Sequence, residues 1–129
     1  MILDTSALIA VLYREPEAEH FARLILDADI CRISVANYLE LSMVVERQIG
    51  IEGMRHAETF LRRAAVVLDP VTVAPVELAR QAFLDFGKGR HRADLNFGDC
   101  FAYALAKATA EPLLFKGLDF SLTDVVCVV

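Results

Sequence analysis

Four acidic residues stand where their side chains could work together, and carboxylates gathered in one place have a defined chemistry. They are Asp4, Glu40, Asp99 and Asp119. Clustered carboxylates repel one another, so close neighbours cannot all stay ionised without a counter-charge. A divalent cation supplies that charge, and ligands that offer only oxygen favour Mg²⁺ or Mn²⁺ over Zn²⁺. The set therefore predicts a carboxylate-bound Mg²⁺ or Mn²⁺ ion.

Asp4 and Glu40 also have ordinary structural interpretations. Asp4 follows the apolar pair 2–3 and could cap the next helix, a task that either of the two hydroxyl residues after it could also perform. The residues one helical turn from Glu40 are Ala36, Met43 and Val44. Glu40 therefore projects from an apolar helix face, and burying an unpaired carboxylate is costly. Either a core arginine or tyrosine pairs with it, or the helix is rotated to give it water.

Asp99 and Asp119 have similar alternatives. Asp99 lies three residues after Asn96, where an acid completes a capping box at the beginning of a helix. Gly98 beside it allows a ligand or another backbone to come close, at a helical cost of about 1 kcal/mol. Asp119 follows a turn that contains Gly117, and taken alone it is typical of a turn or cap aspartate.

The elements that must position these side chains alternate along the chain. Short apolar runs predict strands at 2–3, 31–33, 66–68, 112–115 and 125–129. Apolar residues at three- and four-residue spacing predict helices at 7–13, 16–27, 35–49, 52–64, 75–86 and 96–110. Ser34 is the expected N-cap of the third helix, 35–49, and Gly50 is expected to end that same helix. Gly87 is expected to end the fifth helix, 75–86.

This alternation predicts an α/β fold. Parallel strands need crossover connections, so helices between strands imply a parallel sheet covered on both faces. In such sheets the reactive site lies outside the carboxyl ends of the strands. One carboxylate ends the first strand, two lie near the beginnings of helices that follow strands, and one follows the strand at 112–115. All four can therefore meet at one edge of the sheet.

Length and composition limit the alternatives. The 129 residues suit a single domain, 1–129, and the hydrophobic fraction of 56% supports a large core. No apolar run is long enough to span a membrane, and the first residues lack a basic secretory region, so a cytoplasmic location is expected. The net charge of −5 argues against a broad basic surface for nucleic acid. Cys31, Cys100 and Cys127 are interpreted as reduced core thiols, and His20 and His56 as surface residues.

The ordered set of motifs resembles the PIN-domain ribonucleases, and most nearly the VapC-type toxins of bacterial toxin–antitoxin pairs. The motifs are Asp4-Thr5-Ser6-Ala7-Leu8, Glu40 in an apolar helix, Asn96-Phe97-Gly98-Asp99-Cys100, and Phe115-Lys116-Gly117-Leu118-Asp119-Phe120. The resemblance covers essentially the whole chain. It implies a three-layer α/β/α domain with a central, mostly parallel sheet. It also implies a metal-dependent ribonuclease toxin that cleaves single-stranded or loop RNA through a metal-activated water.

The resemblance also assigns roles to individual residues. The four carboxylates would bind the Mg²⁺ or Mn²⁺ ion and be the catalytic set, while Thr5 and Ser6 would orient a carboxylate or a water. Gly117 stands where many relatives carry a further acid, which leaves open whether one ion or two are bound. The candidate phosphate contacts are Lys88, Arg90, Arg92 and Lys116. A solvated loop is the alternative for residues 87–92. Asp94 could help with metal or water, and the favoured interpretation is that it pairs with Arg90 or Arg92.

Partners and competing functions complete the prediction. The family implies a small VapB-type antitoxin lying over an apolar groove, here helices 7–13 and 21–26 with the helix from 35, and a homodimer; core packing is the alternative for these helices. A non-catalytic PIN-like RNA-binding or interaction module is the main alternative function. A phosphatase of the haloacid dehalogenase type would need an aspartate at Ser6, and a phosphoacceptor receiver domain would have to use Asp69.

Overall fold

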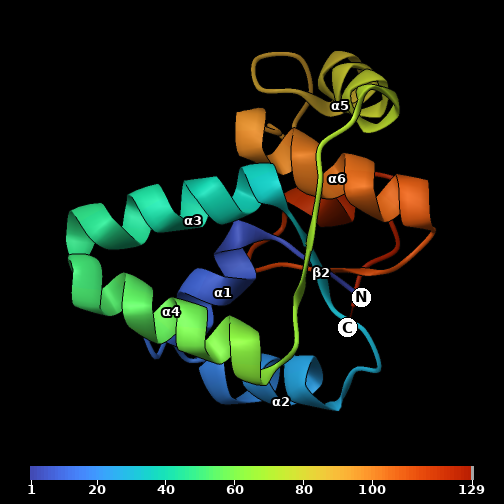
Figure 1. Cartoon of the computed structure of the whole chain (residues 1–129). Helices are drawn as coiled ribbons and strands as arrows, with labels where there is room; N and C mark the ends of the chain where they lie inside the picture. The colour runs from blue at the N-terminus through green and yellow to red at the C-terminus, as the bar shows by residue number, and fades with distance from the viewer. Residues whose placement is uncertain (129) are drawn as a thin grey trace.

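The computed structural model describes residues 1–128, and short parallel strands form the centre of this part of the chain (Figure 1). The strands are β1 (Ile2–Leu3), β2 (Arg32–Ser34), β3 (Val67–Asp69) and β4 (Leu113–Leu114), in the order β3-β2-β1-β4. The helices are α1 (Thr5–Leu12), α2 (Ala18–Asp27), α3 (Val35–Gln48), α4 (Ile51–Arg63), α5 (Val73–Phe86) and α6 (Phe97–Thr109), and the 3₁₀ helix η1 (Asp119–Leu122) follows them. These strands pair in parallel, which confirms the predicted sheet.

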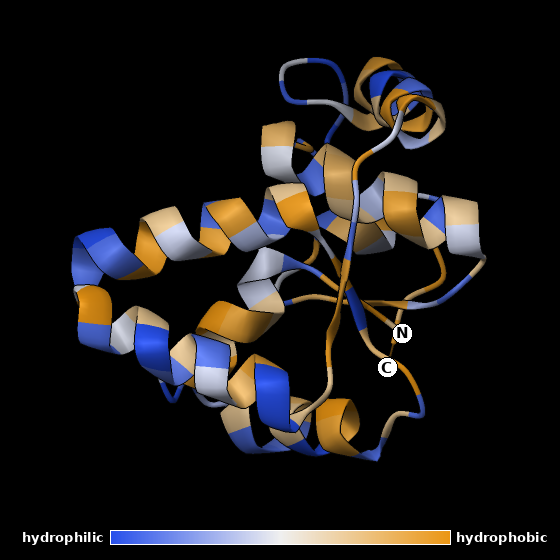
Figure 2. Ribbon diagram, viewed as in Figure 1, coloured by the Kyte–Doolittle hydropathy of each residue, from blue (hydrophilic) through white to orange (hydrophobic). Residues whose placement is uncertain are grey.

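The sheet is covered on both faces because successive strand residues point to opposite sides. Ile2 and Leu113 pack into one core with residues of α5 and α6. Their neighbours Leu3 and Leu114 pack into a second core with residues of α1 to α4. Figure 2 shows α4 and α5 banded with hydrophilic and hydrophobic residues, as expected of helices that bury one side. The three-layer α/β/α prediction is confirmed.

Side-chain caps fix where the helices beside the site begin. Ser34 caps α3, and its side chain accepts a hydrogen bond from the Ala36 N–H at 3.2 Å. Asn96 caps α6 through the capping box that the sequence predicts. Asp4 caps α1, which confirms the structural interpretation of this residue. Helix α1 therefore begins just after β1, α3 begins directly after β2, and α6 begins after the loop that follows α5.

Three predicted boundaries are wrong. Glu17 is the N-cap of α2, so Pro16 precedes that helix, whereas Pro75 lies inside the first turn of α5, where a missing N–H costs no hydrogen bond. The strand predicted at 125–129 is a single bridge between Leu113 and Cys127. Both residues of β4 pair with β1, whereas only Leu113 pairs with the returning chain. Val129 lies outside the described residues.

The remaining expectations about composition hold where the structure addresses them. Cys31 and Cys100 are buried and Cys127 is half-buried, and all three are free thiols. His20 and His56 are exposed. In the part of the chain that the structure describes, no helix combines the length and the apolar character that crossing a membrane would require.

Candidate metal centre

Asp4 lies at the topological switch point of the parallel sheet, where the strand order reverses. β1 is central, with β2 and β3 on one side and β4 on the other, so a crevice opens at its carboxyl end. Asp4 is the first residue after β1, and its N–H donates to the Leu114 carbonyl at 3.0 Å. Its side chain is buried, with an exposed fraction of 3%. The parallel sheet therefore places this carboxylate where the sequence predicts a reactive site.

The two oxygens of Asp4 have different surroundings. Oδ2 accepts hydrogen bonds from the Ser6 N–H at 3.0 Å and from the Ser6 Oγ at 2.6 Å. The Ser6 Oγ accepts in turn from the Lys116 N–H at 3.0 Å, which ties the segment before Asp119 to Asp4. Oδ1 is buried and has no hydrogen-bond partner among the described residues. Burial raises the pKa of Asp4, the Ser6 hydrogen bonds oppose this, and the Glu40 charge adds to it.

The Glu40 carboxylate pairs with a hydroxyl group and not with an arginine or a tyrosine. Thr5 donates a hydrogen bond from Oγ1 to Glu40 Oε1 at 2.5 Å. The Glu40 carboxylate is half-exposed and rests against the backbone of Gly98, where an added Cβ would lie 2.1 Å from Oε2. Gly98 therefore has no side chain because a carboxylate from another helix occupies that space.

Asp99 combines the capping role with a place among the other acids. Its Oδ2 accepts from the Asn96 N–H at 3.0 Å, and its N–H donates to the Asn96 side chain at 2.9 Å. The pKa of Asp99 is raised to about 7, mainly by burial and also by the charges of Asp4, Glu40 and Asp119, while the Asn96 hydrogen bond opposes the rise. Four carboxylates far apart in sequence therefore act on one another electrostatically. Asp119 is the exposed member, at the beginning of η1.

The carboxylates of Asp4, Glu40 and Asp99 offer the oxygen ligands that a divalent cation needs, although they do not yet form a closed coordination shell. Asp4 Oδ1, Glu40 Oε2 and Asp99 Oδ1 have no hydrogen bond within residues 1–128, while the other oxygen of each is held by the protein. Among these same residues, no three His, Cys, Asp or Glu side chains already form a metal-binding group. Carboxylates without a cation repel one another. An ion would therefore have to draw these side chains together.

The candidate phosphate contacts differ in whether an acidic residue already pairs with them. Lys88, Arg90 and Arg92 are exposed, and the Arg90 guanidinium lies 5.8 Å from the centre of the Phe83 ring. The interpretation of Asp94 is wrong: no nitrogen of Arg90 or Arg92 comes within 4.0 Å of its carboxylate in the described chain. Asp94 instead occupies a turn with a φ of 57°, which places its backbone in the left-handed region.

Lys116 is already paired. Its ammonium contacts Glu15 and also Glu17, the latter at 3.3 Å. These two acids lie between α1 and α2, so sequence reasoning had no spacing from which to predict the pairing. Use of Lys116 as a phosphate contact would require these ion pairs to open.

Asn37 is a functional candidate that the sequence reasoning missed. It is fully buried on α3, one turn before Glu40, and its Nδ2 donates to the Gly98 carbonyl at 2.9 Å. The available signal was a polar residue one turn from an acid on an otherwise apolar helix face. Asp69, the only acceptor that a receiver-domain function would offer, ends β3 and contacts Arg32 at 3.7 Å.

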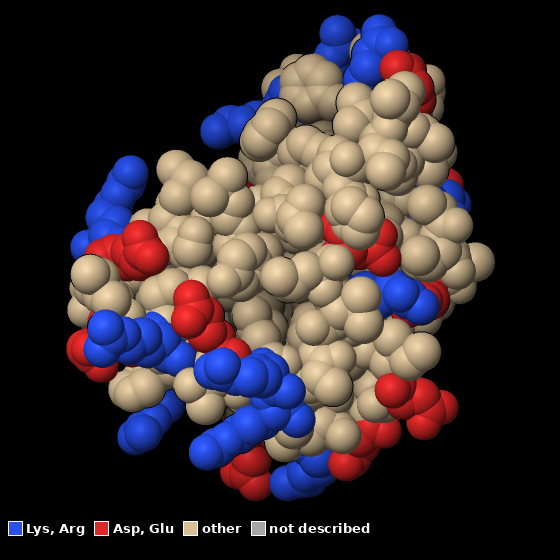
Figure 3. Space-filling view, in the orientation of Figure 1, with Lys and Arg blue, Asp and Glu red and all other residues tan. Residues whose placement is uncertain are grey.

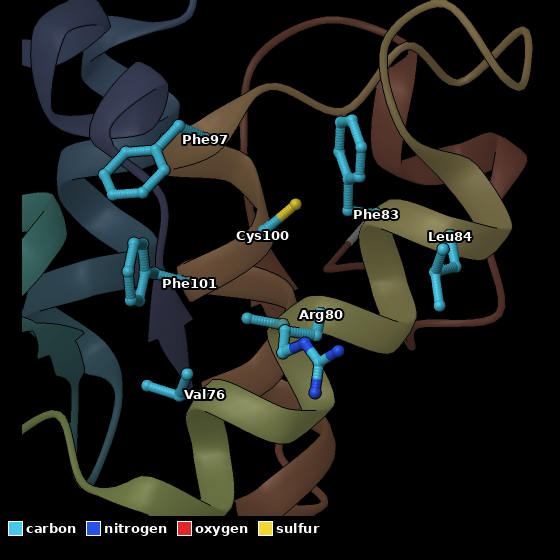
Figure 4. A pocket seen from close by; sticks show the side chains of 8 residues that line it. Val76, Arg80, Phe83, Leu84, Phe97, Cys100 and Phe101 are labelled. Carbon is cyan, nitrogen blue, oxygen red and sulfur yellow. The ribbon is translucent and has the colours of Figure 1, made fainter.

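Apolar hollows flank α6 beside these acids. One of about 460 Å³ lies between α5 and α6, where Figure 4 shows the side chains that line it. Another of about 330 Å³ lies between α3 and α6 and includes Glu40. Phe97 and Phe101 line both hollows, and their rings pack edge to face at 5.0 Å. The antitoxin groove predicted over the early helices includes Ala7 and Leu8, but these two residues belong to the core. For them the core-packing alternative is the correct one.

Comparison with known proteins adds independent observations. The PIN domain family matches residues 1–126. The chain is 48% identical to "Ribonuclease VapC" of Mycolicibacterium smegmatis over 128 residues, which cover 99% of both chains. It is also 48% identical to "Ribonuclease VapC30" of Mycobacterium tuberculosis, with 99% of this chain and 98% of that protein covered.

Solved structures agree with the fold. VapC20 from Mycobacterium tuberculosis, described as a Sarcin-Ricin loop cleaving toxin, superposes with a TM-score of 0.79 at 19% identity, covering 98% of this chain and 97% of that one. VapBC2 from Rickettsia felis, solved with a DNA fragment from its promoter, has a TM-score of 0.76 at 15% identity, with coverages of 98% and 96%.

Proposed function

Because the chain belongs to the PIN-domain family and is similar to VapC ribonucleases over its full length, we propose that Asp4, Glu40, Asp99 and Asp119 are the residues with which it hydrolyses RNA. As a VapC-type protein it is a ribonuclease toxin, and its family consists of nucleases that depend on divalent metal ions. The observation that carries the residue assignment is that Asp4, Glu40 and Asp99 each have one carboxylate oxygen held by the protein and the other free of hydrogen bonds within the described residues. The raised pKa of Asp99, to which Asp4, Glu40 and Asp119 contribute, supports it.

The free oxygens define how these residues would hold the ion. Asp4 Oδ1 lies in a buried position without a partner, where a carboxylate oxygen is costly unless a cation faces it. Asp99 and Glu40 would contribute the oxygen that Asn96 and Thr5 leave free. A bound divalent ion supplies an activated water and neutralises charge on the phosphate during hydrolysis. The all-oxygen ligand set favours Mg²⁺ or Mn²⁺.

Hydroxyl groups keep the carboxylates oriented. Ser6 holds one oxygen of Asp4 and thereby leaves the other directed away from that hydrogen bond. Thr5 does the same for Glu40. Partners of this kind fix the orientation of metal ligands. Thr5 and Ser6 therefore act through the acids rather than on the substrate.

RNA phosphates would meet positive charge beside the acids. Lys88, Arg90 and Arg92 precede Asp99 on an exposed loop, and contacts to phosphate position a nucleic acid without reading its sequence. Lys116 would join them only when Glu15 and Glu17 release it. These contacts suit the single-stranded or loop RNA that the family resemblance implies.

Two partners follow from the same assignment. A small VapB-type antitoxin, of the kind present in the Rickettsia felis complex, would cover the early helices and the site. A second copy of the chain would cover the α3–α5–α6 surface, defined by the exposed residues Leu39, Met43, Val73, Phe83, Leu84 and Phe97. Figure 3 shows basic side chains gathered over α4 and near α5 with a largely uncharged area between them. Apolar area of this kind is typical of a protein interface.

The decisive experiment compares RNA cleavage by the purified, antitoxin-free protein with and without Mg²⁺ or Mn²⁺. Asp4→Asn and Asp99→Asn are expected to lose metal-dependent cleavage because they remove ligand charge while keeping side-chain shape. Glu46→Gln is the control, since Glu46 is an exposed acid on the same helix as Glu40. Folded wild-type protein that binds metal without cleaving any RNA would favour an interaction module. Wild-type protein that binds no metal would refute the four-carboxylate assignment.

A further inference from the structure

Asn37 is a buried polar residue that links two helices of the candidate site. Its side chain has an exposed fraction of 0%, and its Nδ2 donates to the carbonyl of Gly98, 61 residues further along the chain. Its Oδ1 has no hydrogen-bond partner in the described residues. Burying an amide is costly unless it is hydrogen-bonded, and a leucine would fill the same volume without that cost. The fold alone therefore does not explain an asparagine here.

The residue that Asn37 holds is also the one that Glu40 touches. Gly98 contacts the Glu40 carboxylate so closely that it has no room for a Cβ. Gly98 directly precedes Asp99 on α6, while Asn37 and Glu40 lie one turn apart on α3. The hydrogen bond and the carboxylate contact are thus two points of one α3–α6 junction, with an acid on each side of it.

A third connection reaches Asp4. The Thr5 Oγ1 lies 3.3 Å from the carbonyl oxygen of Asn37 and 2.5 Å from the Glu40 carboxylate. Thr5 directly follows Asp4. Asn37 therefore contacts the backbone beside Asp99, shares a partner with Glu40, and touches the residue next to Asp4.

We propose that Asn37 is a positioning residue of the metal centre, whose bond to the Gly98 carbonyl sets the separation between Glu40 and Asp99. The inference rests on the proposed function, because it concerns how the same carboxylates are held. The acids lie on different elements, so only contacts between those elements can fix their spacing. Displacing such supporting residues typically weakens metal binding by about 10–100-fold.

The test is Asn37→Leu, which keeps the volume and removes the donor, with Asn37→Ser as a second variant in case the first does not fold. Titration with MnCl₂, followed by calorimetry, is expected to give a Kd about 10-fold higher than that of the wild type. In RNA cleavage at a fixed Mn²⁺ concentration below saturation, kcat should fall while KM for RNA stays unchanged. Val45→Ala is the matched control, since Val45 is equally buried on α3 and far from the acids in helical register.

The outcomes separate this proposal from the proposed function. If Val45→Ala lowers the melting temperature but leaves the Mn²⁺ Kd unchanged, while Asn37→Leu raises that Kd, the positioning role is supported. If wild-type protein binds Mn²⁺ and both Asn37 variants bind it equally well, the positioning role is refuted and the metal centre stands. If wild-type protein binds no Mn²⁺, the metal centre itself fails and the role of Asn37 fails with it.

Discussion

Replacing Gly98 by alanine should separate the stability of the protein from its ability to bind metal. A Cβ at this position would lie 2.1 Å from Glu40 Oε2 and 2.6 Å from Glu40 Cδ, whereas ordinary contacts are no closer than about 3.4 Å. The Glu40 carboxylate must therefore move by more than about 1 Å. Displacements of about 1 Å in a catalytic site are sufficient to lower rates by about 100-fold.

The same substitution should cost the fold little. Alanine is favoured over glycine within a helix by about 1 kcal/mol, and the displaced group is the end of a flexible side chain. We expect the metal-free Gly98→Ala protein to melt near or above the wild type, while its Mn²⁺ affinity falls about 10–100-fold. Differential scanning calorimetry and titration with MnCl₂ measure the two effects separately.

Gly53→Ala is the matched control for this prediction. A Cβ there would lie 2.7 Å from Ile49 Cβ and 3.1 Å from a methyl group of Val45, so it should lower the melting temperature. Because it lies on α4, away from the four acids, it should leave Mn²⁺ affinity unchanged. Wild-type Mn²⁺ affinity in Gly98→Ala would show that the Glu40 carboxylate is not a metal ligand in this geometry.

Two further predictions concern charge and assembly. Because the pKa of Asp99 is about 7 in the fold and near 3.8 in an unfolded chain, the folded state binds the proton more tightly. The melting temperature of the metal-free protein should therefore fall as the pH rises from 5 to 7.5; Asp99→Asn should flatten this profile, and an unchanged slope would contradict it. Leu84→Glu, on the α3–α5–α6 surface, should convert a dimer to a folded monomer in light scattering, whereas a wild-type monomer would exclude that interface.

The parts of the fold that the sequence predicts are those set by local pattern. Periodic apolar residues give the six helices of the described chain to within a few residues, and Ser34 and Asn96 cap two of them as expected. The strand predicted at 125–129 depends instead on pairing with the distant β4, where the structure has only the Leu113–Cys127 bridge. Apolar composition carries no information about how far such long-range pairing extends, so the prediction was wrong there.

The same distinction applies to the site. Asp4, Glu40 and Asp99 are detectable because each stands in a marked local setting: a strand end, an apolar helix face and a capping box. Asn37 and the Lys116 ion pairs with Glu15 and Glu17 are different, because their partners lie 61 and about 100 residues away. Only the folded arrangement of α3 against α6, and of the β4–η1 segment against the α1–α2 turn, brings them together.

The structural and chemical interpretations of these acids are compatible, because a carboxylate has two oxygens. Asp4 caps α1 with Oδ2 and leaves Oδ1 unpartnered, whereas Asp99 completes the capping box of α6 with Oδ2 and leaves Oδ1 free. The positive end of each helix dipole also offsets part of the repulsion among the acids. An alanine at either position would remove a capping hydrogen bond together with the proposed metal ligand, so lost activity would have two explanations. An asparagine keeps an acceptor for the cap and removes the charge, which makes the asparagine variants the ones that test the metal centre.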